Sequence, residues 1–452
     1  MKGETAAEKI GAFVASASTQ VATPEVVHQT ARAFVDTFAV AVAGRSEPAT
    51  QIIRNYVLDG DCGGPSTLWT TGERTRPEDA ATFNATAAHV LDFDDVTSPQ
   101  RGHPSVVVLP ALVALGEAQE VTGAQIGASY AVGLEVIVKM SRAMAMKHYT
   151  KGWHSTSTIG ALGGAAGCAH LLGLDAQQAT AAIGIAVAQA AGARRSFGTM
   201  TKSLQPATAA ATAIRSARLA ARGFTAPTDS LEGAFGFMDL YGNGEELDGE
   251  LDTLGNVPLE VFRTGLEVKK YPCCYATHRV IQGILDMDAE RRIRSSEVER
   301  VRVTVQPTGL VPLIHKRPWR GLEGKFSMEY VVAAAIVDKA VRLQSFTDSA
   351  VQRPEVQSLL RKVETVEESG EPWPRRALVE VELRNGETRS IRVEALRGSA
   401  QLPLSEGELA QKLHDCATYS HFEMDIDGFL SAAWNWADRP IRSILGDPRK
   451  AG

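Results

Sequence analysis

The sequence has few cysteines, no secretory signal and no clear metal-binding pattern. Five cysteines occur in 452 residues, and no two of them have the spacing of a zinc finger. The first residues are polar and lack the apolar core of a signal peptide. An odd number of cysteines without such a signal favours reduced thiols. We therefore expect a cytoplasmic protein without disulfides.

Long apolar runs and a strong net charge are also missing. The smoothest apolar runs, residues 158–172 and 180–193, are interrupted by His170 and Gln189 and are too short for a bilayer span. The net charge of −6 gives no general attraction to nucleic acid or to an anionic membrane. An anionic substrate would therefore need a local group of cationic side chains.

The chain is too long for one compact core, so we expect two domains. Thr23 and Pro24 have the chemistry of a helix start, with Thr as the N-cap and Pro in the first turn. Gly and Ala fill many positions of the following apolar patterns, which lets helices approach closely. Apolar residues at helical spacing predict further helices over 110–119, 122–146, 156–172, 175–191 and 206–222.

The pattern changes after about residue 262. Residues 299–305 and 377–383 alternate polar and apolar side chains, and Asn385-Gly386 before 388–393 predicts a hairpin. Helices are expected at 327–342 and 349–362, and again from residue 406. We predict a mainly α protein with a large all-helical domain and a smaller α+β domain. The expected bounds are 1–262, completed by C-terminal helices in 398–452, and 263–397.

Four short segments place ionisable or hydrogen-bonding side chains beside Gly or Pro, where the chain changes direction. A core disfavours such groups, whereas a site that moves protons on an anion needs them. These segments indicate an enzyme. They are residues 92–104, 152–154, 198–203 and 271–278.

The first segment contains Asp92, Asp94 and Asp95, which repel one another unless solvated, capped or bound to a positive group. The run could end a helix in an Asx-turn, or it could position a substrate or a histidine. A magnesium–diphosphate site is disfavoured, because Ser98 stands where a further Asp is needed and a second Asp-rich run is missing. Nearby His103 is suited to proton transfer near neutral pH, and a structural role is the alternative.

The second and third segments offer a further imidazole and several cations. His154 precedes residues with N-cap chemistry, and a helix N-terminus there would suit a carboxylate. Arg194 and Lys202 follow the Ala-rich helix and could hold a carboxylate or stabilise an enolate. An aromatic loop plug and a solvated helix end are the corresponding structural alternatives.

The fourth segment places Cys274 close to Lys269, Lys270 and His278. Neighbouring cations lower the pKa of a thiol, so we expect a lowered pKa for Cys274. Cys274 and His278 are four residues apart and would share one helix face. They could form an acid/base pair or lie side by side in a cleft wall, and a buried inert cysteine is the alternative.

The order and content of these segments resemble the MmgE/PrpD family, which includes 2-methylcitrate dehydratase, cis-aconitate decarboxylase and iminodisuccinate epimerase. The resemblance spans nearly the whole chain. Residues 152–154, 198–202 and 272–278, and the loop length from Asp92 to His103, are most similar to the epimerase branch. The resemblance implies a homodimer with a cleft between its two domains, and neither an organic cofactor nor a required metal.

The family's functional positions match individual residues of this chain. The dehydratase and decarboxylase branches carry a His or an acid where Cys274 stands, which argues against a decarboxylase. Gln205 replaces a His of the epimerase-like branch, and His315 falls where the decarboxylase has a substrate-contacting Tyr. The candidate catalytic residues are His103, His154, Lys202 and Cys274, and the candidate substrate-binding residues are Asp92, Thr97, Arg194, Lys269, Lys270, Tyr275, His278 and His315.

We predict an enzyme that removes a proton next to a carboxylate of a di- or tricarboxylic acid, as an epimerase or a dehydratase-like lyase. His103 or His154 would be the base, and the other imidazole or Cys274 the acid. A cis-aconitate-type decarboxylase and a non-catalytic polycarboxylate-binding protein are the alternatives. We expect no metal or cofactor site and no nucleic-acid or membrane partner.

Overall fold

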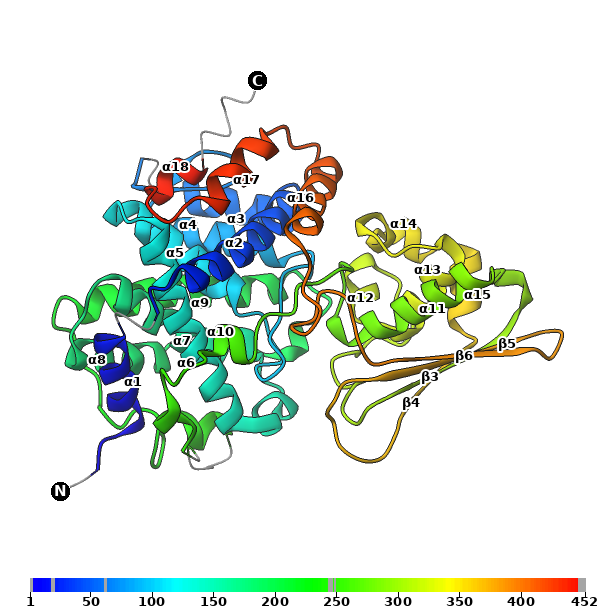
Figure 1. Cartoon of the computed structure of the whole chain (residues 1–452), viewed down its shortest axis with the longest axis horizontal. Coiled ribbons are helices and arrows are strands. Elements are labelled where there is room, and N and C mark those ends of the chain that lie inside the picture. Colours follow the sequence, from blue (N-terminus) through cyan, green and yellow to red (C-terminus); the bar gives the residue numbers. More distant parts are fainter. Residues whose placement is uncertain (1–2, 18–20, 61–62, 243–246, 248, 446–452) are drawn as a thin grey trace.

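The computed structural model describes residues 3–17, 21–60, 63–242, 247 and 249–445. It is 56% helix and 9% strand, which confirms the predicted mainly α class. Figure 1 shows a helical bundle on one side and a sheet with its helices on the other. The bundle contains α1 (Ala6–Ser16), α2 (Pro24–Gly44), α3 (Pro48–Leu58), α4 (Pro77–His89), α5 (Ser105–Gln119), α6 (Gly123–Lys151), α7 (Ser155–Leu171), α8 (Ala176–Val187), α9 (Thr201–Ala220) and the short α10 (Glu260–Arg263).

Close helix contacts hold the bundle together. The predicted helix start is confirmed, because the Thr23 side chain accepts a hydrogen bond from the Val26 amide at the start of α2. Small residues allow α6 and α7 to touch, since a Cβ on Gly163 would lie only 2.6 Å from the Gly133 carbonyl oxygen. A two-residue hairpin, β1 (Ser66–Thr67) and β2 (Arg74–Thr75), lies beside α5.

Two prolines lie inside helices rather than at their starts. Pro110 is in α5 and Pro206 is in α9, and both helices begin five residues earlier. Each proline forfeits one backbone hydrogen bond, and burial along both helices outweighs that loss. Helix α8 ends at Val187, earlier than predicted, so Arg194 lies in a separate 3-10 turn. Lys202 consequently stands in the first turn of α9.

The second unit is a four-stranded sheet with helices on one face. Strands β5 (Ala377–Leu383) and β6 (Thr388–Val393) form the predicted hairpin, and β3 (Val298–Val305) pairs with β5 in antiparallel fashion. The edge strand β4 (Val363–Glu367), which the sequence did not indicate, runs parallel to β3. The helices of this unit are α11 (His278–Glu290), α12 (Gly321–Gly324), α13 (Met328–Asp338), α14 (Asp348–Val351) and α15 (Pro354–Leu360).

The sheet order β4-β3-β5-β6 and the helix contacts define the second core. Helix α11 packs on β5 and β6, and α13 packs on β4. The predicted helix over 349–362 is instead two short helices, α14 and α15, because Pro354 begins a new one. Figure 1 shows these helices above the sheet.

The last three helices return to the bundle. They are α16 (Glu406–Ser420), α17 (Ile426–Trp434) and α18 (Ile441–Leu445). The rings of Phe38 in α2 and Phe429 in α17 stack with centroids 4.3 Å apart, and Trp436 lies in the same apolar core.

The domain bounds drawn from the sequence stay a prediction. Among the described residues, none of the helices combines the length and apolar character that a bilayer crossing requires.

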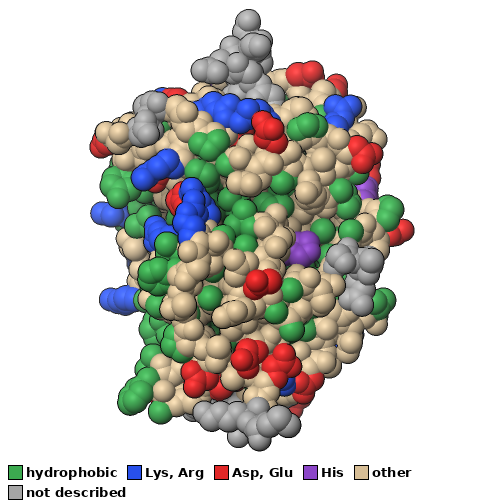
Figure 2. Space-filling model, turned by 90° about the vertical axis from the view of Figure 1, so that its left-hand side faces the viewer, with side chains coloured by type: hydrophobic (Ala, Val, Ile, Leu, Met, Phe, Trp, Pro, Cys, Tyr) green, Lys and Arg blue, Asp and Glu red, His purple; other side chains and the backbone are tan. Residues whose placement is uncertain are grey.

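The bundle surface at the left of Figure 1 has mixed character. Basic and acidic side chains are scattered there among apolar and uncharged polar ones (Figure 2).

Candidate active site

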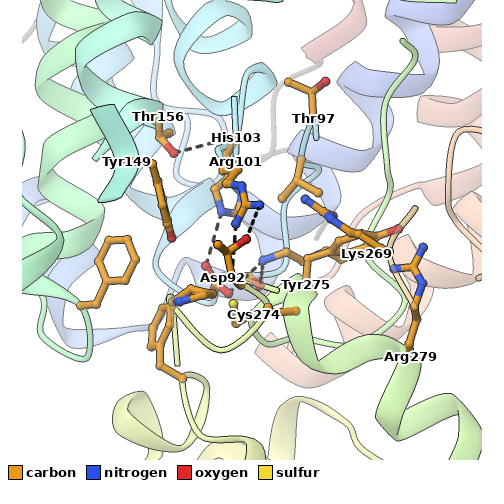
Figure 3. Close-up of a pocket in the computed structure, with 18 of the residues that line it drawn as sticks. Asp92, Thr97, Arg101, His103, Tyr149, Thr156, Lys269, Cys274, Tyr275 and Arg279 are labelled. Carbon is orange, nitrogen blue, oxygen red and sulfur yellow. Dashed lines mark hydrogen bonds and ion pairs between the residues drawn. The ribbon is translucent and has the colours of Figure 1, made fainter. Parts of the chain in front are cut away.

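A pocket lies at the junction of the helical bundle and the sheet unit. The loop between α4 and α5 forms one wall, the ends of α6 and α9 form another, and the segment leading into α11 closes it (Figure 3). Residues before β5 and after β3 complete the lining. Its ionisable lining side chains are Asp92, Arg101, His103, Tyr149, His154, Lys202, Lys269, Cys274, Tyr275, Arg279, Arg375 and Arg376.

Asp92 binds two buried lysines that come from opposite walls. Its Oδ1 lies 2.7 Å from the Lys202 Nζ, and its Oδ2 lies 2.9 Å from the Lys269 Nζ. Lys269 also donates to the Asp92 carbonyl oxygen at 2.7 Å. Asp92 has a left-handed φ of 52°, which is unfavourable for a residue other than Gly. These bonds over-determine the conformation, as happens at functional sites.

A second carboxylate, Asp94, orients two imidazoles. Its Oδ2 lies 2.8 Å from the His89 Nδ1 and 3.0 Å from the His103 Nδ1. The His89 Nε2 lies 2.6 Å from the Lys202 ammonium, which can only donate, so His89 is neutral with its proton on Nδ1. His103 has carboxylate oxygens near both ring nitrogens, because its Nε2 also lies 3.6 Å from the Asp92 Oδ1. We call these residues the His89–Asp94–His103 triad.

His154 has its own orienting partner. It is the N-cap of α7, and its Nδ1 lies 2.6 Å from the Gln205 Oε1. The Gln205 amide nitrogen donates to the Ala193 carbonyl and to Ser196, which fixes the amide orientation. Gln205 Oε1 is therefore an acceptor, and the His154 Nδ1 carries the proton. The unprotonated Nε2 is then the basic atom of this ring.

The surroundings of His103 and His154 favour the neutral form of each imidazole, and more strongly so for His154. Burial lowers the pKa of His154 well below its usual value, and the nearby Lys202 lowers it further. Burial also lowers the pKa of His103, but Asp94 opposes this shift. For Asp92, burial alone would raise the pKa, yet Lys202 and Lys269 hold it well below its usual range. His103 is therefore the imidazole more ready to accept a proton.

Two further buried lysines fasten the Asp-rich loop to the segment that enters the sheet unit. The Lys325 Nζ donates to the Leu91 and Pro272 carbonyls at 2.6 and 2.7 Å. Lys412 of α16 donates to the Phe93 and Lys269 carbonyls. Burial lowers the pKa of Lys325 to about 8. These bonds fix the position of the Asp-rich loop relative to the segment that enters the sheet unit.

Eight of the twelve residues predicted from the sequence line the pocket. They are Asp92, Thr97, His103, His154, Lys202, Lys269, Cys274 and Tyr275. The prediction of a lowered pKa for Cys274 was wrong. Burial, with the negative charge of Asp92, raises the pKa of this thiol. Cys274 is therefore a neutral thiol in this pocket.

The other four predicted residues are placed outside the pocket lining. Arg194 lies behind Tyr149, with its guanidinium 4.1 Å from the ring centroid and hydrogen bonds to two carbonyls. Lys270 is exposed and points to Gln282. The Cys274–His278 acid/base pair, one of the alternatives left open by the sequence, is not formed, because His278 begins α11 and its Nε2 faces the Cys273 carbonyl.

His315 is the fourth of these residues. Its Nε2 lies 3.3 Å from the Phe197 carbonyl oxygen, and its ring packs against Gly198. Gly198, with a φ of 86°, leaves room for this ring, because a Cβ there would lie 2.5 Å from the imidazole nitrogen. His315 therefore supports the wall that carries Phe197 and does not face the pocket.

The sequence interpretation missed several residues of the site. Arg101, Arg279 and Arg375 line the pocket. His89, a member of the triad, contacts the Lys202 ammonium through its Nε2. A single Arg in a loop or at a helix start carries no sequence signal for a site. Arg101 stands inside the segment 92–104, and Arg279 directly follows the segment 271–278.

The triad also has the composition of a metal site, because its three ligand atoms lie within 4.8 Å of one another. The His89 Nδ1, however, points its proton at Asp94. The Lys202 ammonium occupies the other nitrogen of His89. A divalent cation would have to displace this proton beside a fixed positive charge, so this cluster favours hydrogen bonding over metal binding.

Comparison with known families fits this two-part architecture. The MmgE/PrpD N-terminal domain model matches residues 8–250, and the MmgE/PrpD C-terminal domain model matches residues 271–437. The chain belongs to the MmgE/PrpD family. The predicted family is thereby confirmed, while the predicted likeness to the iminodisuccinate epimerase branch stays a prediction.

This MmgE/PrpD protein is similar over most of its length to known enzymes. It is 28% identical to the cis-aconitate decarboxylase of Homo sapiens over 437 residues, which cover 94% of this chain and 90% of the relative. It is 26% identical to the cis-aconitate decarboxylase of Aspergillus terreus over 362 residues, which cover 75% and 74% of the two chains. These relatives are lyases.

Proposed function

We propose that this protein is a lyase that decarboxylates a polycarboxylate of the cis-aconitate type by proton transfer from histidine. The observation that carries the proposal is the meeting of two oriented imidazoles, His103 and His154, with the Lys202 ammonium in one pocket. Among the described residues, the pocket lining contains six Lys or Arg side chains and one acid, Asp92. Such an excess of positive charge suits a substrate with several carboxylates. The similarity to cis-aconitate decarboxylases supports the reaction type.

The chemistry follows from where charge develops. When the bond between carbon and the leaving carboxylate breaks, CO₂ departs and its electron pair stays on the substrate. The negative charge spreads through the adjacent double bond to a remaining carboxylate, where Lys202 can stabilise it. One proton must then be added to carbon. The overall reaction turns a tricarboxylate trianion and one proton into a dicarboxylate dianion and CO₂.

His103 is the proposed proton donor. Its Nδ1 is held by Asp94, and its Nε2 lies 3.6 Å from the Asp92 Oδ1, so carboxylates lie near both ring nitrogens. A bound polyanion would raise the pKa of this imidazole further and load it with a proton before reaction. His154 has Gln205 in place of an acid and stays neutral. We therefore assign His154 to hydrogen bonding or to proton removal.

Proton exchange without loss of CO₂, as in an epimerase, is the second candidate. The neutral thiol of Cys274 favours it, because it lines the same pocket as His154 and could return a proton that the imidazole removes. An epimerase needs two such groups, whereas a decarboxylase needs one donor.

Proton NMR in D₂O distinguishes these functions. The wild-type protein is incubated separately with cis-aconitate, citrate, 2-methylcitrate and iminodisuccinate. A decarboxylase converts cis-aconitate into a five-carbon unsaturated dicarboxylate that carries one deuterium, whereas an epimerase exchanges a substrate proton without losing carbon. His103→Gln should lower the decarboxylation rate at least roughly 100-fold. Tight binding of cis-aconitate with neither product nor exchange would refute the proposal and would favour a binding protein.

A further inference from the structure

The inner part of the pocket has little positive charge to spare. Lys202 and Lys269 are buried, and each forms an ion pair with Asp92. His103 and His154 are neutral at pH 7, because burial lowers the pKa of each ring. A substrate carboxylate that binds here competes with Asp92 for the two ammonium groups. The excess positive charge of the pocket must therefore lie elsewhere in its lining.

The unmatched charge lies at the partly exposed side of the pocket. Arg101 donates to the Thr308 hydroxyl at 2.9 Å, and the Arg279 Nε donates to the Glu394 carbonyl at 3.1 Å. Within the described ranges of the chain, neither guanidinium forms an ion pair with an acid. Both line the pocket and both are half-buried. Their charges remain available to an anion.

Arg375 connects these two guanidinium groups. Its guanidinium carbon lies 5.2 Å from the Tyr275 ring centroid, and that of Arg279 lies 6.0 Å from the same ring. Glu267 pairs with Arg375 at 3.2 Å. Burial, followed by repulsion from Arg375, lowers the pKa of Arg101 to about 10. Three guanidinium groups that repel one another in a shared hollow are stabilised when an anion binds between them.

An unpartnered hydroxyl lies in the same pocket. Thr97 is completely buried, and its Oγ1 finds no hydrogen-bond partner among the residues that the structure describes. A buried hydroxyl without a partner is unfavourable, and a ligand oxygen would satisfy it. Thr97 belongs to the same loop as Arg101. Figure 3 shows Thr97 and Arg279 away from the Tyr149 wall of the pocket.

We propose that Arg101, Arg279 and Arg375 form an outer subsite that binds a non-reacting carboxylate, so that the protein selects tricarboxylates over dicarboxylates. The assignment of this carboxylate to a substrate rests on the proposed function, whereas binding at the subsite does not need turnover. The inner group of Asp92 and the lysines then receives the carboxylates next to the reacting carbon. Charge-assisted hydrogen bonds from arginine provide the discrimination.

The test is calorimetric binding of unreactive acids to the full-length protein at fixed ionic strength. Tricarballylate carries three carboxylates, and glutarate and methylsuccinate each lack one of them. The wild type should bind tricarballylate roughly 10- to 100-fold more tightly than at least one of the two dicarboxylates, as expected for one charged hydrogen-bonded group. Arg101→Gln and Arg279→Gln should remove most of this preference while leaving the affinity for the more weakly bound dicarboxylate within about twofold. Arg101→Lys, which keeps the charge but loses the planar fork, should restore part of it.

Arg195→Gln is the matched control, because Arg195 is exposed and lies outside the pocket lining. It should leave all three affinities unchanged, and thermal melting should show that every variant is folded. Equal weakening of all three acids by Arg101→Gln and Arg279→Gln, or no weakening, would overturn the subsite. Arginine-dependent tricarballylate binding by a protein that turns over no polycarboxylate would leave the subsite standing and would refute the lyase function alone.

Discussion

Asp92→Asn is the substitution that best tests how the site is held together. The carboxylate lies 2.7 Å from one buried ammonium and 2.9 Å from another. At such distances, with an effective dielectric constant of about 20, each pair has a gross attraction of about 6 kcal/mol, which desolvation largely offsets. Asparagine keeps an acceptor but loses the charge, and the repulsion between Lys202 and Lys269 remains.

The net loss is smaller than the gross attraction because a buried lysine can release its proton. That release limits the penalty at pH 7 to about 4–5 kcal/mol per lysine. Removing one partner of a buried ion pair destabilises proteins by about 3–5 kcal/mol. An unfolding entropy of about 2.1 cal/mol/K per residue amounts to about 0.9 kcal/mol/K for this chain. Asp92→Asn should therefore lower the Tm by about 3–5 °C, and by more in a transition confined to one unit.

Differential scanning calorimetry at pH 7 provides the measurement, and Asp338→Asn provides the control. Asp338 forms two hydrogen bonds with Arg353, at 2.7 and 2.6 Å, but both side chains are partly exposed. An exposed pair contributes about 1 kcal/mol or less, so the control should melt within about 1 °C of the wild type. If Asp92→Asn also melted within 1 °C, the two lysines would not depend on this carboxylate, and our account of the site would be wrong.

Three other predictions concern protonation, positioning and metal. Burial lowers the pKa of His148 to about 4, so the neutral ring contributes its full stability above pH 6.5, and this contribution falls by about 2 kcal/mol at pH 5. In urea titrations between these pH values, the free energy of unfolding of His148→Asn should therefore decrease less than that of the wild type. Gln205→Leu should lower kcat roughly tenfold or more with little change in KM. Gln205→Glu should retain activity and move the acidic limb of the pH–rate profile to higher pH, a shift that a purely structural role of Gln205 would not produce. Dialysis against EDTA should leave the decarboxylation rate unchanged, and a loss that added Zn²⁺ restores would contradict the hydrogen-bonded triad.

Much of the fold could be read from local patterns. The hairpin strands at Ala377–Leu383 and Thr388–Val393 have the predicted bounds, because alternation and an Asn-Gly turn are local signals. Strand β4 escaped prediction, since its five residues include three with little burial and it depends on β3 as a partner. Pro110 and Pro206 misled the prediction of helix starts, because burial along α5 and α9 outweighs a local preference.

The candidate site was predictable where chemistry and chain punctuation coincide. His103, His154 and Lys202 stand beside Gly or Pro or at a helix start, and all three line the pocket. Arg194 and His315 have equally suitable side chains, yet they brace the walls through Tyr149 and Phe197. Residue type and spacing could not separate these cases, because the direction of a side chain depends on packing.

The sequence by itself determined the family, the mainly α class and the presence of histidines and lysines suited to moving protons on a polyanion, because residue type and local pattern carry that information. Only the tertiary structure decided which charges are neutralised. Asp92 binds Lys202 and Lys269 across more than a hundred residues of chain. Arg101 lies near Arg375 and forms an ion pair with none of the acids in the described part of the chain. Coulomb interactions depend on distance and burial, and those quantities exist only once the chain is folded.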